Sequence, residues 1–301
     1  MIGYGVFVLG VVASGDSVMN LNLDLGRLTG PLLVFGGPYS NRQATEALRA
    51  EAERVGIPPE RCICTGDVVA YCADPVGTTD LIRDWGCPVV MGNCEESLAE
   101  GAEDCGCGFL SGSTCDLLSR QWFEYASACL RPDQREWMAT LPRLIRFEVE
   151  GSAVAVLHGA VDQINRFIFA STPEVEKCRQ ADLAEAEVVL AGHCGLPFTQ
   201  RLHDGRIWHN AGVIGMPAND GDTTVWYSLV VPQGGSLRFE HRRLGYDYSA
   251  AAAAMRKAGL AEDYARALET GLWSSLDVLP AHERAATGRA MMLDQEPFTP
   301  P

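Results

Sequence analysis

Four side chains with the chemistry of metal ligands each follow a short apolar segment of this 301-residue chain. A carboxylate, an amide oxygen and two imidazoles are a set of donors that suits a divalent transition metal such as Mn, Fe or Zn. One histidine at the end of a strand is more often a hydrogen-bonded structural residue than a ligand, but four such residues at successive strand ends are harder to explain by packing. We therefore predict one metal site, formed by Asp67, Asn93, His158 and His193.

The elements that must position these side chains alternate in the first hundred residues. Apolar segments at 32–35, 61–65 and 88–91 predict strands, and residues 43–55 and 77–84 have the composition and spacing of helices. Strands that alternate with helices are typical of α/β proteins with a parallel sheet. In such sheets the ligand site lies at the carboxyl ends of the strands, so the polar turns that follow them should converge.

The rest of the chain predicts further strands and helices within a single domain that spans residues 1–301. Residues 1–30 predict an N-terminal strand extension, because 6–12 is apolar and 21–25 alternates between apolar and polar. We expect a Cys-rich and helical insertion at 98–142 and a helical tail at 243–301. Further predicted strands lie at 146–149, 153–157, 188–191, 201–202, 206–209, 224–231 and 237–242, and further predicted helices at 119–129, 133–141, 172–184 and 250–269.

Five motifs occur in order along the chain: GDVVAYCADP at 66–75, GNCE at 92–95, LHG at 157–159, GHCGLPF at 192–198 and NAGVIGMP at 210–217. In order, spacing and placement at strand ends, they resemble the motifs of the calcineurin-like metallophosphoesterases, especially their compact bacterial phosphodiesterase-like branch. The resemblance implies a four-layer α/β/β/α sandwich of two sheets flanked by helices. It also implies a site where metal-activated water attacks the phosphorus of a small phosphorylated substrate.

The resemblance further implies two neighbouring metal positions, of which only one keeps all its ligand types here. In the other position, the family's Asp-x-His falls on residues 37–39 (Gly-Pro-Tyr) and its last His falls on Gly195, so only the shared Asp67 remains. The family's leaving-group His falls on Cys94, and the Asp partner of that His falls on Glu95. We therefore expect a mononuclear or rebuilt site in which Cys94 or Glu95 manages protons.

The glycine-rich loop at 36–41 and several thiols supply the remaining candidates. A glycine-rich turn that opens a helix presents N–H groups to an anion, although a tight strand-to-helix connection explains this loop equally well. Cys72 is a candidate extra metal ligand, although a buried cysteine usually behaves as a small hydrophobe. For Cys105, Cys107 and Cys115 of the insertion, a plain loop is favoured over a metal or redox site. The candidate substrate-binding residues are Tyr39, Ser40, Asn41 and Cys194.

The composition excludes several classes of partner. The formal net charge of −15 argues against binding to a nucleic-acid backbone. No stretch reaches the ~20 apolar residues of a bilayer span, and no basic residue precedes Arg27, so we predict neither membrane insertion nor a secretory signal. Eleven cysteines, an odd number scattered through strands and loops, predict reduced thiols in a cytoplasmic protein. Assembly into a homo-oligomer stays open.

Three functions remain open at the level of sequence. The first is hydrolysis of a phosphomonoester or phosphodiester at the mononuclear or rebuilt metal site. The second is different chemistry on the same fold, with thiolates tuning iron or zinc, because a fold does not determine a function. The third is a non-catalytic binding or regulatory module, in which the four retained ligand types would still argue for metal binding.

Overall fold

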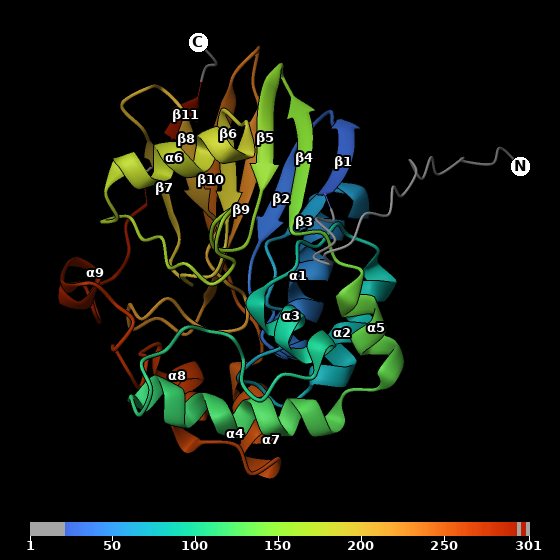
Figure 1. Cartoon of the computed structure of the whole chain (residues 1–301), viewed down its shortest axis with the longest axis vertical. Helices are drawn as coiled ribbons and strands as arrows, with labels where there is room; N and C mark the ends of the chain where they lie inside the picture. The colour runs from blue at the N-terminus through green and yellow to red at the C-terminus, as the bar shows by residue number, and fades with distance from the viewer. Residues whose placement is uncertain (1–21, 294–295, 299–301) are drawn as a thin grey trace, which may run out of the picture.

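The computed structural model describes residues 22–293 and 296–298. Two β-sheets pack face to face, and helices cover the outer face of each sheet (Figure 1). This arrangement is the predicted four-layer α/β/β/α sandwich. The strand predicted at 6–12 lies outside the described residues.

The first sheet contains the strands of the early α/β pattern. Its strand order is β11-β10-β9-β2-β3, in which β2 runs parallel to β3 and antiparallel to β9. The hairpin β9–β10 was expected from the Gly-Gly turn between the two strands. The strands are β2 (Leu32–Phe35), β3 (Cys62–Cys64), β9 (Val225–Pro232), β10 (Leu237–Leu244) and β11 (Glu296–Phe298).

The second sheet has the order β1-β4-β5-β6-β8-β7. At its centre β5, β6 and β8 are parallel, so their carboxyl ends lie at one edge. The predicted hairpin around Glu150 and Gly151 joins β4 to β5, and the N-terminal extension contributes β1, which pairs parallel with β4. The strands are β1 (Asn22–Arg27), β4 (Leu144–Val149), β5 (Ser152–Val156), β6 (Val188–Ala191), β7 (Phe198–Arg201) and β8 (Ile207–Asn210).

The helices fall into two layers and two added segments. In the sandwich itself, α1 and α2 lie against the first sheet and α6 against the second. The predicted insertion forms α4 and α5, and the tail forms α7 to α9. The helices are α1 (Arg42–Arg54), α2 (Pro75–Trp85), α3 (Asn93–Glu100), α4 (Thr114–Cys129), α5 (Pro132–Ala139), α6 (Glu174–Ala184), α7 (Tyr248–Lys257), α8 (Glu262–Thr270) and α9 (Ala281–Ala285), with a 3₁₀ turn at Pro59–Arg61.

The strand β2 is apolar throughout because both of its faces are covered. Side chains alternate between the faces of a strand, so Leu32 and Val34 enter the core between the two sheets while Leu33 and Phe35 face the helices. The ring of Phe35 stacks on Trp85 of α2, with 5.5 Å between the ring centroids. A strand enclosed in this way delivers its following loop to a set position.

Side-chain caps determine where the helices after β2 and β3 begin. The carboxamide of Asn41 accepts a hydrogen bond from the N–H of Ala44 at 3.1 Å, and the carboxylate of Asp74 accepts one from Gly77 at 2.7 Å. Such caps satisfy N–H groups that the first helical turn leaves without partners. They hold the loops that follow the two strands, which are the loops of the predicted site.

Two predicted elements differ from the structure. The segment 88–91 forms a single bridge between Val89 and Cys64 in place of a strand, because the N–H of Met91 turns away to donate to Pro142 at 2.7 Å. The tail is not wholly helical, since β11 joins the edge of the first sheet. No helix among the described residues combines the length and the apolar character needed to cross a bilayer.

Candidate functional site

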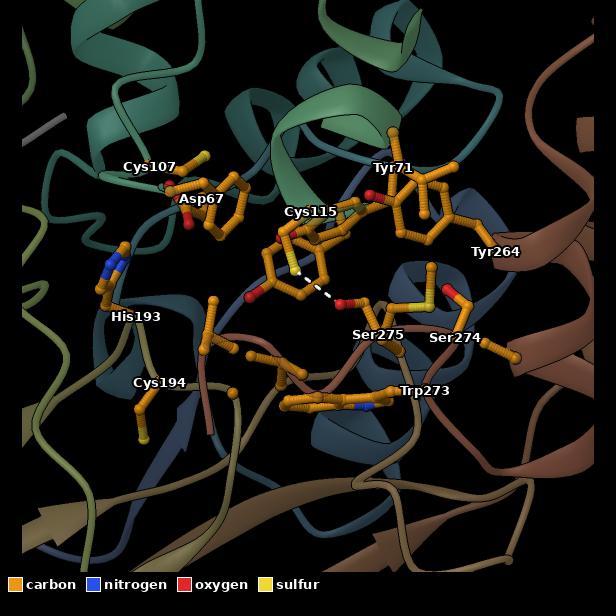
Figure 2. A pocket seen from close by; sticks show the side chains of 18 of the residues that line it. Asp67, Tyr71, Cys107, Cys115, His193, Cys194, Tyr264, Trp273, Ser274 and Ser275 are labelled. Carbon is orange, nitrogen blue, oxygen red and sulfur yellow. Dashed lines mark hydrogen bonds between the residues drawn. The ribbon is translucent and has the colours of Figure 1, made fainter. Parts of the chain in front are cut away.

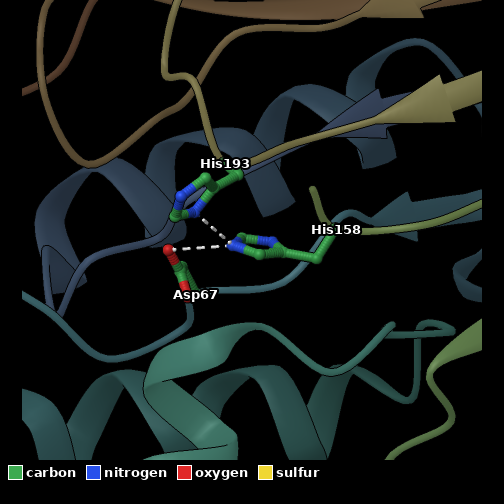
Figure 3. Close-up of side chains that lie close together, drawn as sticks. All are labelled: Asp67, His158 and His193. Carbon is green, nitrogen blue, oxygen red and sulfur yellow. Dashed lines mark hydrogen bonds and ion pairs between the residues drawn. The ribbon is translucent and has the colours of Figure 1, made fainter. Parts of the chain in front are cut away.

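Three predicted ligands and the amide of a fourth meet at the carboxyl ends of the strands. The Nε2 atom of His158 lies 3.2 Å from a carboxylate oxygen of Asp67 and 3.0 Å from Nδ1 of His193 (Figure 3). The same Nε2 atom lies 3.1 Å from the carbonyl oxygen of Asn93. All four side chains are buried. The structure therefore brings together the residues that the strand-end pattern singled out.

The backbone around these residues is unusually constrained. Asp67 and His193 both have left-handed φ values, 57° and 61°, which few residues other than glycine adopt. Conformations of this kind concentrate at functional sites, where the surrounding structure enforces them. The carbonyl of Thr65 accepts a hydrogen bond from Nδ1–H of His158 at 2.7 Å, which turns Nε2 toward Asp67. The loops thus orient the donors before any ligand binds.

The charge states of the site suit a cation. Burial opposes ionisation of Asp67, but the adjacent imidazole of His158 more than offsets it and holds the pKa of the carboxyl below its usual range. Burial, and then the neighbouring His158, lower the pKa of His193 to about 3. His193 is therefore neutral at physiological pH, which is the form that ligates metals.

The donor set fits a divalent metal ion. Ligand atoms of Asp67, His158 and His193 all lie within 4.8 Å of one another. The nitrogen of His193 that faces the other ligands is Nδ1, which lies 3.0 Å from Nε2 of His158. A carboxylate with two imidazoles is a common set for Zn, Fe or Mn.

The carboxylate of Glu95 connects the loop after β3 to the start of α3. One of its oxygens accepts hydrogen bonds from the N–H groups of Asp67 (2.8 Å) and Gly92 (3.0 Å), and the other accepts from Val69 (3.2 Å). Burial, and then the charge of Asp67, raise the pKa of Glu95 to about 7. These contacts favour a positioning role for Glu95. The catalytic role predicted from the sequence stays a prediction.

The other proposed catalytic residue, Cys94, lies beside the same carboxylate. Its backbone N–H lies 3.3 Å from an oxygen of Asp67, and the amide nitrogen of Asn93 lies 3.5 Å from its sulfur. Burial raises the pKa of its thiol well above the ordinary value, and the charges of Asp67 and Glu95 add to this. Cys94 is thus a protonated thiol next to the site, which does not favour a thiolate ligand.

The loop predicted to bind an anion has its N–H groups occupied. Backbone N–H groups of residues 37, 39 and 40 donate to the carbonyls of residues 66, 67 and 68, at 2.9 to 3.2 Å. The tight connection is therefore the correct interpretation, and the anion cradle is wrong. Asn41 is also fully used, because its amide caps α1 and donates to the carbonyl of Gly215 at 3.1 Å. Ser40 is buried away from the pocket described below, which Tyr39 does line.

Two further thiols are engaged in packing. Cys72 is buried, and its sulfur lies 3.7 Å from the carbonyl of Gly215, so it is not brought to the predicted ligands. Cys194 borders the pocket, but the amide of Asn210 donates to its sulfur at 3.2 Å and its thiol lies 3.6 Å from the carbonyl of Leu196. Both thiols serve the loops around the site.

The expectation of reduced thiols is wrong for one pair in the insertion. Cys105 and Cys107 form a disulfide, with their Cα atoms 5.3 Å apart. Gly106 between them has a φ of 63°, which lets so short a ring close without steric cost. The carbonyl of Cys105 accepts a hydrogen bond from the amide of Asn93 at 2.8 Å. The insertion therefore orients one of the predicted ligands.

A pocket that is partly open to solvent extends outward from Asp67 and His193 (Figure 2). The sequence placed no functional residue in the tail, yet the tail forms one wall of this pocket. In the sequence, only the aromatic residues that follow an Ala-rich helix could have indicated that the tail borders a pocket. The tail residues that border the pocket are Tyr264, Ala267, Trp273, Ser274, Ser275 and Val278.

The sandwich and the converging strand ends define a class of fold, that of the calcineurin-like metallophosphoesterases. No family model matches the chain. The crystal structure of a metallophosphoesterase from Sphaerobacter thermophilus is similar, at 21% identity, over 81% of this chain and 100% of that one, with a TM-score of 0.63. The hypothetical protein PH1004 from Pyrococcus horikoshii OT3 matches at 17% identity over 82% of this chain and 100% of its own, with a TM-score of 0.68.

A curated protein is also similar to this chain in sequence. The uncharacterized protein MJ0912 of Methanocaldococcus jannaschii is 23% identical over 238 residues, which are 72% of this chain and 88% of that protein. At these levels of identity the similarities show the fold. The chemistry must be argued from the site.

Proposed function

We propose that this protein is a metal-dependent phosphoesterase that hydrolyses a small phosphomonoester or phosphodiester at a single-metal site. The observation that carries the proposal is the buried cluster of Asp67, His158 and His193, whose ligand atoms lie within 4.8 Å of one another at the inner end of a pocket. The similar metallophosphoesterase from Sphaerobacter thermophilus supports the reaction class by analogy of fold.

The residues of this chain have distinct roles in the proposed site. Asp67, His158 and His193 hold the cation, with the amide oxygen of Asn93 as a fourth donor. A divalent ion held there supplies Lewis acidity toward water and toward a phosphoryl oxygen. Glu95 keeps the loop of Asp67 in place through the three backbone hydrogen bonds described above.

Side chains on the opposite side of the site favour one metal over two. The ring of Tyr39 folds back against Gly37, so closely that a Cβ atom on that glycine would lie 2.5 Å from the ring. The indole of Trp273 lies over Gly195, 3.4 Å from where a Cβ atom would be. These are the positions where the resemblance expects ligands of a second metal. Aromatic rings border that space instead.

The proposal is tested by metal analysis paired with hydrolysis assays. Protein purified without oxygen should bind one equivalent of Mn, Fe or Zn and hydrolyse at least one member of a panel of phosphomonoesters and phosphodiesters. Asp67→Asn and His193→Ala should each reduce metal binding and abolish turnover. His282→Ala, at an exposed histidine of α9 that belongs to no group of potential metal ligands among the described residues, is the matched control and should change neither.

Three results would contradict the proposal in different ways. Two tightly bound metals would overturn the single-metal site. One bound metal without hydrolysis of any ester would favour the non-catalytic binding module. If the metal-loaded protein also showed a thiolate charge-transfer band, the alternative in which thiolates tune the metal would be favoured. No metal above trace levels in any preparation would overturn the metal site itself.

A further inference from the structure

The pocket beside the proposed metal site is lined by the loops at the strand ends and by two segments outside the sheets. The loop after β3 contributes Tyr71, the disulfide-containing insertion contributes Cys107 and Phe109, and the tail contributes Tyr264 and Trp273. Figure 2 shows these walls around a space that leads from Asp67 and His193. The insertion and the part of the tail that lines the pocket lie outside the two sheets, so these walls are added to the sandwich.

Rings dominate the lining. The Tyr71 and Tyr264 rings touch, with centroids 4.9 Å apart, and Phe167 lies against the imidazole of His193 with centroids 4.1 Å apart. Phe109 lies 6.4 Å from Phe167, in a stacked orientation. Aromatic faces attract other flat rings by stacking, and this attraction is largely indifferent to the identity of the ring. The path from the site is thus bordered by rings on several sides.

The indole of Trp273 is held rigidly at the floor of this space. Its Nε1–H donates to the carbonyl of Pro217 at 2.7 Å, and its backbone N–H donates to the side-chain oxygen of Asn219 at 2.8 Å. Figure 2 shows the indole edge-on, with one face turned toward Cys115 and Ser275. A ring that is anchored through its edge keeps a face available for a ligand, and little side-chain entropy is lost on binding.

The charge of the lining is as informative as its shape. Among the described residues that line the pocket there is no Lys or Arg, and the one carboxylate is Asp67 at the site itself. The whole chain carries a formal net charge of −15. Apart from the proposed metal ion, no side-chain cation would therefore offset an additional phosphate charge in this pocket. The lining favours a ligand with the smallest phosphate charge and an uncharged remainder.

We propose that the pocket receives an uncharged aromatic ring of a phosphodiester substrate, which Trp273 and Tyr264 select by stacking. The proposal rests on the phosphoesterase function proposed above and names its substrate class: a diester with one negative charge and one flat, neutral ester arm. In the reaction the oxygen of water bonds to phosphorus and one P–O ester bond breaks. One proton of the water goes to the departing alcohol oxygen, and the other is released or stays on the product phosphate.

A matched pair of diesters tests the selection of a ring. Benzyl methyl phosphate and cyclohexylmethyl methyl phosphate carry the same charge, have similar size and release alcohols of similar basicity, and only the first contains a flat aromatic ring. We expect kcat/KM about tenfold higher for the benzyl diester, the size of one stacking interaction. Benzyl phosphate, with its second charge, should be the poorer substrate. The methyl ester of thymidine 5′-phosphate shows whether a nucleobase serves as well as a simple aryl group.

Variants assign the effect to the pocket. Trp273→Leu and Tyr264→Leu should each reduce the benzyl preference, measured as the ratio of kcat/KM for the two diesters, several-fold. Trp137→Leu, at a half-buried tryptophan of α5 outside the pocket, should keep the full preference. Because Trp273 also bonds to the loop of Pro217 and Asn219, thermal unfolding of each variant checks that the fold is intact, and Tyr264→Leu provides the independent test.

Binding measurements separate this proposal from the proposed function. Calorimetric affinities of the two diesters for the metal-loaded protein do not depend on turnover. Tenfold tighter binding of the benzyl diester without hydrolysis would overturn the phosphoesterase function and sustain the ring pocket. Equal affinities and equal rates for the pair, with hydrolysis of both, would sustain the function and overturn the ring pocket.

Discussion

The substitution Glu95→Gln tests whether this carboxylate positions the metal loop. In the structure it accepts three hydrogen bonds from backbone N–H groups, at 2.8, 3.0 and 3.2 Å, and it has no exposed surface. Glutamine keeps one oxygen but turns the other into an NH₂ group. The least damaging arrangement directs this group at Val69, where two donors then face each other and the N–H of Val69 loses its partner.

The expected loss of stability follows from these contacts. A hydrogen bond to a charged group contributes ~1.5–3 kcal/mol, and a buried unpaired donor costs ~1–3 kcal/mol, while removal of a buried charge offsets part of the loss. We expect Glu95→Gln to lower the free energy of unfolding by about 3 kcal/mol. At ~2 °C per kcal/mol for a chain of this size, the midpoint of thermal unfolding should fall by about 6 °C.

The same substitution should weaken metal binding without removing a ligand. Residues that orient ligands typically contribute 10–100-fold to metal affinity, so calorimetry should detect a loss in this range. Glu100→Gln, at the exposed end of the same helix, is the control and should change stability by less than ~0.5 kcal/mol. If Glu95→Gln leaves stability and metal affinity unchanged but lowers kcat, Glu95 is a proton-transfer residue and the positioning argument is refuted.

Three further predictions concern other parts of the chain. Gly92→Ala would direct a methyl group into the backbone and carboxylate of the site aspartate, so calorimetry should show at least tenfold weaker metal binding. The control is Gly245→Ala, which has open space around it and should bind the metal with unchanged affinity. Lys177→Met removes the donor to three part-buried acceptors and should lower the denaturant-derived stability by about 2 kcal/mol, against under ~0.5 kcal/mol for Lys257→Met. Burial lowers the pKa of His241 to about 4, so the folded state favours the neutral form of this imidazole. The free energy of unfolding should therefore fall by roughly 2 kcal/mol as the pH drops from 6.5 to 4. The substitution His241→Gln should remove this part of the pH dependence.

The predicted elements agree best with the structure where the pattern is local and strong. The all-apolar strand β2 and the helix that follows it are confirmed, because a strand covered on both faces and a capped amphipathic helix leave clear signatures. The strand predicted at 88–91 is reduced to one bridge, since its next partner is a carbonyl more than fifty residues away. Periodicity does not carry information about such a partner.

The predicted site residues also agree with the structure where the prediction depends on the order of elements, and differ where it depends on long-range contacts. The sequence led to Asp67, Asn93, His158 and His193 because parallel strands present their carboxyl ends at a common edge, and this topology can be read from the order of elements. The same reasoning wrongly assigned substrate contacts to Asn41, whose polar groups are used within the loops. Residue type alone does not reveal which of two polar groups faces a cavity and which faces the backbone.

By itself, then, the sequence indicated the α/β order of elements and the strand-end donors, because these follow from residue type and order along the chain, while the sandwich and the missing ligands of the first loop were implied by the resemblance. Tertiary structure alone decided that Cys105 and Cys107 are joined, that Glu95 holds the loop of Asp67, and that Trp273 forms the floor of the pocket. The last two depend on contacts between segments that are distant in the sequence, and the first depends on the backbone at Gly106, which composition does not encode. The ring-lined pocket arises from such contacts, and it supplies the most specific statement about the substrate.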